Sequence, residues 1–176
     1  MIRALVLFLV VSGLVSICSG QGKTKSANYT FPEPDSEFVV SFPEKPVVKT
    51  LFSDAGSSLQ AELYLGNLSF LRAESQRMTD AVIKRLHEAD DSELAKVPLD
   101  YAANIALKNP TVVVTRTEFG RCAKLRGYAK VNDTAIYYEV YFYVGKTDVI
   151  GLYVAAPSGQ YPTPAILRFL NSLRRK

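Results

Sequence analysis

The 176-residue sequence has few of the residues on which metal and redox sites depend. It contains one histidine, His87, two cysteines, Cys18 and Cys122, and no tryptophan. A single histidine excludes a histidine-rich metal site and the HExxH motif. The sequence also lacks a CxxC pair, a nucleophile elbow, a phosphate-binding loop and a dinucleotide fingerprint. We therefore expect no enzyme activity, no cofactor and no bound metal.

A strong charge of either sign is absent too. Beyond residue 20 the chain carries twenty Lys and Arg against seventeen Asp and Glu, a net charge near +3. This charge is too small to indicate a nucleic-acid ligand.

The only long apolar run lies at the N-terminus. Arg3 precedes an apolar run over residues 4–17, and the small residues Ser19 and Gly20 follow. This layout is typical of a secretory signal peptide. A fourteen-residue helix covers roughly 21 Å, less than the ~30 Å hydrocarbon core of a bilayer. We predict a signal peptide over residues 1–20, export to the periplasm or the exterior, and no stable membrane span after its removal.

Cys18 allows a second interpretation. "VSIC" resembles the bacterial lipobox, in which the cysteine becomes the lipidated first residue, but Ile17 stands where that motif normally has Gly, Ala or Ser. Cleavage after Gly20 fits the small-residue rule better, and lipid anchoring at Cys18 is the alternative. With Cys18 removed, Cys122 has no partner for an internal disulfide.

After the polar segment 21–34, which is typical of a flexible linker, residues 35–176 are expected to form one domain. Helical periodicity predicts a helix over residues 78–89, a second that begins at Pro98, and a third that Thr163 caps. Alternation and turn residues predict the strands, which are 37–42, 47–52, a pair around Gly66-Asn67, 111–118, 120–130, 134–144 and 148–156.

This order of elements favours an α+β fold with a central antiparallel sheet sandwiched by helices, because short turns join neighbouring strands antiparallel. In the last helix, Ile166, Phe169, Leu170 and Leu173 recur at helical spacing and are expected to pack on the core. The segment 174–176 is basic and is expected at the negative end of that helix.

Tyrosines concentrate in the stretch 134–144. Residues of odd number there, Tyr137 and Tyr141 among them, share the face opposite an apolar set that includes Val140 and Phe142. The preceding strand contributes Lys124, Arg126 and Lys130 to the tyrosine side. Such a face can be a half-exposed sheet stabilised by cross-strand pairs, or lie under a helix. It can also be a docking surface, because Tyr and Arg are favoured at recognition sites.

Three segments together resemble the PsbP-like fold. They are "FVVSFPEKPVV", "GYAKVNDTAIYYEVYFYVGKTDVIGLYVAAP" and "ILRFLNSL", which span most of residues 37–173. The family includes extrinsic photosystem subunits, a Ran-GTPase-binding protein and many exported bacterial proteins of unknown role. The resemblance implies a sheet between helices and action by binding rather than catalysis.

The leading hypothesis is an exported binding or assembly protein that presents this sheet face to a protein partner, with Tyr137, Tyr141, Lys124, Arg126 and Lys130 as the contact surface. One alternative is a carrier with an apolar pocket for a small ligand. Another is an enzyme that uses Cys122 or His87, because the neighbouring basic residues could lower the pKa of the thiol.

Overall fold

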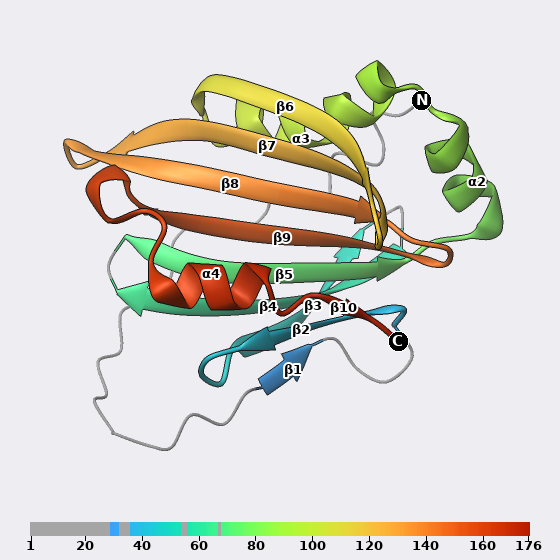
Figure 1. The fold of residues 1–176 in the computed structure, drawn as a ribbon, viewed down its shortest axis with the longest axis horizontal. Coiled ribbons are helices and arrows are strands. Elements are labelled where there is room, and N and C mark those ends of the chain that lie inside the picture. The colour runs from blue at the N-terminus through green and yellow to red at the C-terminus, as the bar shows by residue number, and fades with distance from the viewer. Residues whose placement is uncertain (1–28, 32–35, 54–55, 67) are drawn as a thin grey trace.

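A seven-stranded antiparallel sheet organises the computed structural model, which describes residues 29–31, 36–53, 56–66 and 68–176 (Figure 1). A small second sheet of order β1-β2-β10 packs against one of its faces. In spatial order the large sheet consists of β3 (Val47–Ser53), β4 (Gly56–Gly66), β5 (Ser69–Arg77), β9 (Asp148–Pro157), β8 (Thr134–Val144), β7 (Gly120–Val131) and β6 (Lys108–Thr117). The small sheet consists of β1 (Tyr29–Phe31), β2 (Phe38–Phe42) and β10 (Arg174–Arg175).

Helices and the small sheet cover the two faces of the large sheet. On one face lie α2 (Asp80–Glu88) and α3 (Asp91–Asn104). On the other lie α4 (Pro164–Leu170), which follows the short 3-10 turn η2 (Ser158–Gln160), and the small sheet. The predicted α+β class with an antiparallel central sheet is confirmed.

The alternation of side chains along β7 and β8 decides which residues enter the core. Leu125 pairs with Val140 and Ala123 with Phe142, and all four are buried on the face of α2 and α3. The turn before β7 requires Gly120, which has φ +114°, because a Cβ there would collide with the carbonyl oxygen of Val144.

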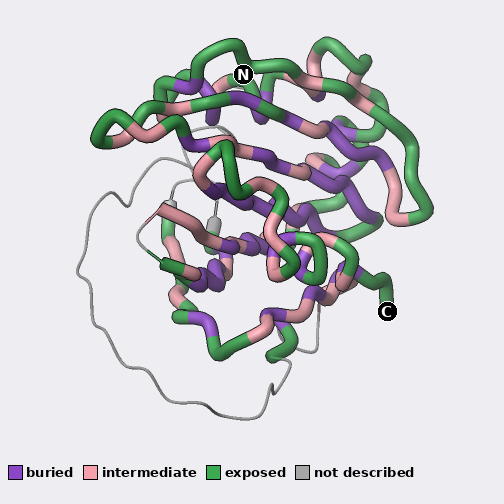
Figure 2. The backbone as a smooth tube through the Cα atoms, turned by 60° about the vertical axis from the view of Figure 1, so that its left-hand side comes forward, coloured by how far each residue is buried: buried purple, intermediate pink, exposed green. Residues whose placement is uncertain are grey.

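The opposite face has its own apolar core under α4 and β2. Phe169 of α4 and Phe42 of β2 are fully buried with ring centroids 4.9 Å apart. They lie in one cluster with Leu71, Leu152 and Val154 of the central strands. The colouring in Figure 2 follows this arrangement, with buried residues running along the middle strands.

The second helix begins earlier than predicted. It starts at Asp91 and contains Pro98 in its interior. Asp90 caps it by accepting a hydrogen bond from the Glu93 amide at 2.8 Å, and burial of Leu94 offsets the cost of an internal proline.

The two ends of the domain also differ from expectation. Residues 29–31 lie in the predicted linker but form β1, and Phe31 is buried edge-on against Phe42. The C-terminal arginines 174–175 form β10 instead of ending the helix, because α4 stops at Leu170. The predicted signal peptide and Cys18 lie outside the described residues. Within the described ranges, no helix is long and apolar enough to span a bilayer.

Candidate binding surface on the sheet

The structure brings four of the five predicted site residues together. Lys124 and Arg126 on β7 lie in register with Tyr141 and Glu139 on β8, and Tyr137 pairs with Tyr128. We call the set Lys124, Arg126, Tyr128, Tyr137 and Tyr141 the tyrosine surface.

Glu139 lies at the centre of this surface, and sequence reasoning did not assign it a role. Only 3% of the residue is exposed. Its Oε1 accepts hydrogen bonds from Nε of Arg126 and the hydroxyl of Tyr141, both at 3.0 Å, and forms an ion pair with Lys124. Its Oε2 accepts a hydrogen bond from the hydroxyl of Tyr161. Its position between the two tyrosines and opposite Arg126 is the signal that could have identified it.

This network holds the cations of the surface in place. Nζ of Lys124 donates to the Tyr141 hydroxyl at 2.5 Å and lies 4.4 Å from the centre of that ring. Two cations surround one carboxylate, so the cluster keeps one positive charge in excess. The side chain of Arg126 is 54% exposed and can present that charge to solvent.

Tyr137 and Tyr141 of the surface remain neutral phenols at physiological pH. Burial raises the pKa of Tyr141, and the neighbouring carboxylate of Glu139 raises it further. The same two causes, in the same order, raise the pKa of Tyr137. The hydroxyls of Tyr137 and Tyr141 therefore keep their protons and can donate hydrogen bonds.

A run of aromatic rings crosses the surface. The rings of Tyr128 and Tyr137 lie 5.1 Å apart, and Tyr161, from the loop before α4, lies 4.2 Å from Tyr137. Tyr137 and Tyr141 are half-buried, whereas Tyr128 is 44% exposed. Part of the predicted face is therefore covered, as one of the two interpretations expects, and part stays accessible.

The fifth predicted residue, Lys130, does not join the Glu139 network. It lies at the end of the β7–β8 hairpin, where its ammonium group forms an exposed ion pair with Asp133 at 2.6 Å.

Only part of the sheet face that carries the tyrosine surface is covered by other elements. In Figure 1, α4 lies in front of β4 and β5, whereas β7 and β8 are open toward the viewer along most of their length. Val113 on the outer strand β6 is 59% exposed and extends the open area beside Lys124, its partner in the strand register.

Two surface pockets adjoin α4. One, of about 300 Å³, lies between the end of α4 and the rings of Phe119, Tyr141 and Tyr143, with Leu170 and Leu173 in its wall. The other, of about 740 Å³, lies between α4 and β2.

The two residues considered for catalysis lie on opposite faces. Cys122 is buried in the cluster under α4, and burial raises the pKa of its thiol to about 11. The alternative in which basic neighbours lower this pKa is contradicted, because desolvation outweighs the effect of Lys124. His87, on α2, is exposed, and its Nε2 hydrogen bonds with the carbonyl oxygen of Gly145 at 2.9 Å.

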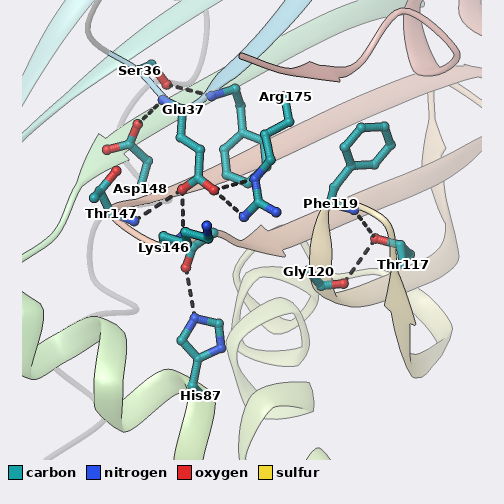
Figure 3. Close-up of polar contacts among 12 residues, drawn as sticks. Ser36, Glu37, His87, Thr117, Phe119, Gly120, Lys146, Thr147, Asp148 and Arg175 are labelled. Carbon is teal, nitrogen blue, oxygen red and sulfur yellow. Dashed lines mark hydrogen bonds and ion pairs between the residues drawn. The ribbon is translucent and has the colours of Figure 1, made fainter.

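A second polar cluster fastens the small sheet to the β8–β9 turn (Figure 3). The carboxylate of Glu37 accepts hydrogen bonds from the amides of Lys146 at 2.5 Å and Thr147 at 3.2 Å, and forms an ion pair with Arg175. The Glu37 amide donates to Asp148 at 2.6 Å. Burial opposes ionisation of Glu37, but the two amides and Arg175 outweigh it and lower its pKa.

Similarity to solved structures identifies the fold. The cyanobacterial PsbP protein CyanoP from Synechocystis sp. PCC 6803 matches with a TM-score of 0.59 at 8% identity, over 93% of this chain and 100% of that one. A protein from Bacteroides thetaiotaomicron VPI-5482 matches with a TM-score of 0.52 at 12% identity, over 86% of this chain. This chain spans 49% of the length of the Bacteroides protein.

The chain therefore has a PsbP-like fold, and the resemblance that its sequence shows is confirmed at the level of the fold. No protein-family model and no curated protein sequence matches it.

Proposed function

We propose that this chain is an exported, non-catalytic binding or assembly protein, and that it presents the tyrosine surface to a protein partner. The observation that carries the proposal is the Glu139 network. A buried carboxylate holds Lys124 and Arg126 beside aromatic rings on an open part of the sheet.

Such a surface suits recognition for two physical reasons. Tyr and Arg supply much of the binding energy at protein interfaces. Side chains that are already held in one geometry lose less entropy when a partner binds. The excess positive charge favours a partner with acidic residues around the point of contact.

The absence of catalysis is part of the proposal. The thiol of Cys122 is buried and has a raised pKa, so little thiolate is available for attack. His87, on the other face, has no nucleophile among its described hydrogen-bond partners.

The test uses variants of exposed residues in a pull-down from the envelope or secreted fraction of the host. Arg126→Glu and Tyr128→Ala should abolish recovery of a partner that the wild-type chain captures. Arg85→Glu on α2 is the matched control, because it makes the same change of charge at an exposed position on the opposite face. Equal recovery by Arg126→Glu and Arg85→Glu would refute the proposed surface.

Export is tested by the intact mass of the protein recovered from the host. We expect a chain that begins at Gln21 after cleavage behind Gly20. A diacylglyceryl mass on Cys18 would instead show a lipid anchor.

A second candidate is a small-ligand carrier, which the pocket beside Phe119 and Tyr143 favours. Its volume of about 300 Å³ lies at the lower end of the range for ligand pockets. If this candidate is correct, native mass spectrometry of protein purified from the host should show the added mass of a small molecule. If it is not, the measured mass should be that of the chain alone.

A further inference from the structure

Strand β3 forms one outer edge of the large sheet, and its outer side pairs with no strand of the described chain. Three of its seven residues are large, apolar and exposed. Val47 is 70% exposed, Val48 56% and Phe52 82%.

The other outer strand, β6, is built differently. It carries Lys108, Pro110 and Arg116, and among its residues only Val113 is a large exposed apolar one. Proline and cations are the usual means of preventing an edge from pairing with another chain. In β3 the single cation is Lys49, and its ammonium lies 3.8 Å from Glu62. The edge formed by β3 thus lacks the protection that β6 has.

The strand register shows which backbone groups of β3 point outward. Ser53 pairs with Gly56, and two residues separate them in the sequence. A two-residue hairpin turn is closed by a hydrogen-bonded pair, and such pairs alternate along the strand. The amide and carbonyl groups of Val48, Thr50 and Phe52 therefore point away from β4, toward the open edge.

We propose that β3 pairs antiparallel with β3 of a second copy of this chain, about a twofold axis at Thr50. In this register Val48 lies opposite Phe52 of the second copy, and Phe52 lies opposite its Val48. All four side chains fall on the same face of the joined sheet, because alternate residues share a face. These side chains, which are exposed in a single copy, would form an apolar cross-strand cluster in the dimer.

Charge and side-chain pairing select this register over its neighbours. An axis at Lys49 would place two lysines directly opposite each other, which is unfavourable. An axis at Leu51 would leave Val48 without Phe52 as its partner. With the axis at Thr50, Lys49 lies opposite Leu51 and can keep its contact with Glu62.

The pairing between copies determines how the two tyrosine surfaces are oriented. The twofold axis of an antiparallel strand pair is perpendicular to the sheet, so equivalent faces of the two copies point the same way. Both tyrosine surfaces would then lie on one side of a continuous sheet, and a partner with repeated sites could engage both.

The test is sedimentation velocity of the full chain over a range of concentrations. We expect a dimer whose fraction rises with concentration. Phe52→Lys should raise its dissociation constant at least about tenfold, because it removes both apolar cross-strand pairs. Val113→Lys, on the opposite edge, is the matched control and should leave the dissociation constant unchanged. Thermal unfolding checks that each variant folds.

A second variant distinguishes strand pairing from general stickiness. Thr50→Pro removes an amide that points outward, so the β3–β4 pairing is retained while the pairing between copies is lost. We expect a folded monomer. The proposal is overturned if the wild-type chain stays monomeric at every concentration, or if the dimer persists in Phe52→Lys or in Thr50→Pro.

Discussion

The two halves of the sheet face that carries α4 use the same backbone in different ways. Leu71 of β5 and Leu152 and Val154 of β9 point to this face and lie in the apolar core under α4 and β2. Across β7 and β8 they are tyrosines and cations around Glu139, and no described helix covers most of them. The comparison shows that strand order alone does not determine whether a sheet face becomes core or surface. The outcome depends on whether α4 or the small sheet packs over the strands.

The largest expected effect comes from the covered half. Phe169→Ala should lower the free energy of unfolding by about 3–5 kcal/mol, because it empties a fully buried site beside Phe42. Urea denaturation measures this change. Leu167→Ala, on the exposed side of the same helix, is the control, and the half-buried Leu170 should give an intermediate value. Equal effects at positions 167 and 169 would show that α4 is not docked as described.

In the open half the largest effect should come from its one buried charge. Glu139→Gln should cost about 1–3 kcal/mol, because Lys124 and Arg126 lose their counter-charge while they stay partly shielded from water. Denaturation at two salt concentrations measures it. Asp133→Asn removes the exposed partner of Lys130 and should change nothing measurable. A neutral result for Glu139→Gln would mean that the network does not hold the surface in place.

The stability that Glu37 contributes by holding the small sheet to the β8–β9 turn should depend on pH. The folded protein lowers the pKa of Glu37 below its ordinary value of 4.5, so the stability that its ionised form contributes is present above that value. This contribution is lost as the pH falls through the lowered pKa. Glu37→Gln should therefore be less stable than the wild type at pH 7, by about 1 kcal/mol, with the gap closing in acid. Thermal unfolding at both pH values tests this, and a gap that widens in acid would contradict the sign.

The smallest effect should come from the most exposed ring of the open half. Tyr128→Ala should cost roughly 0.2–1 kcal/mol, because it removes only a cross-strand contact with Tyr137. Calorimetry of the wild type and of the Tyr128→Ala variant measures this difference in stability. A larger loss would show that Tyr128 is part of the core, and the comparison between the halves would need revision.

Much of this fold follows from local sequence patterns. The strands predicted between residues 111 and 156 agree closely with β6 to β9, because alternation, short turns and Gly120 all specify the same register. Thr163 caps α4 as predicted, by accepting from the amide of Ile166 at 3.2 Å.

Other elements depend on contacts that no local pattern records. β1 has three residues and β10 has two, and each exists because β2 offers an edge to pair with. The Glu139 network could be predicted in part, since Glu139 shares its face with Tyr137 and Tyr141. Tyr161 could not, because it reaches the carboxylate from a loop more than twenty residues away in the sequence.

The position of β9 has a consequence for how the chain reaches its native state. β9 lies between β5 and β8, and the chain visits α2, α3 and three further strands before it fills that place. Until residues 148–157 are available, β5 and β8 each expose the unpaired edge that β9 later fills. Closure of such long-range pairings is slow, and the two edges stay open to other chains until it occurs. The joining of the units β3-β4-β5 and β6-β7-β8 by this strand is therefore expected to limit the rate of folding.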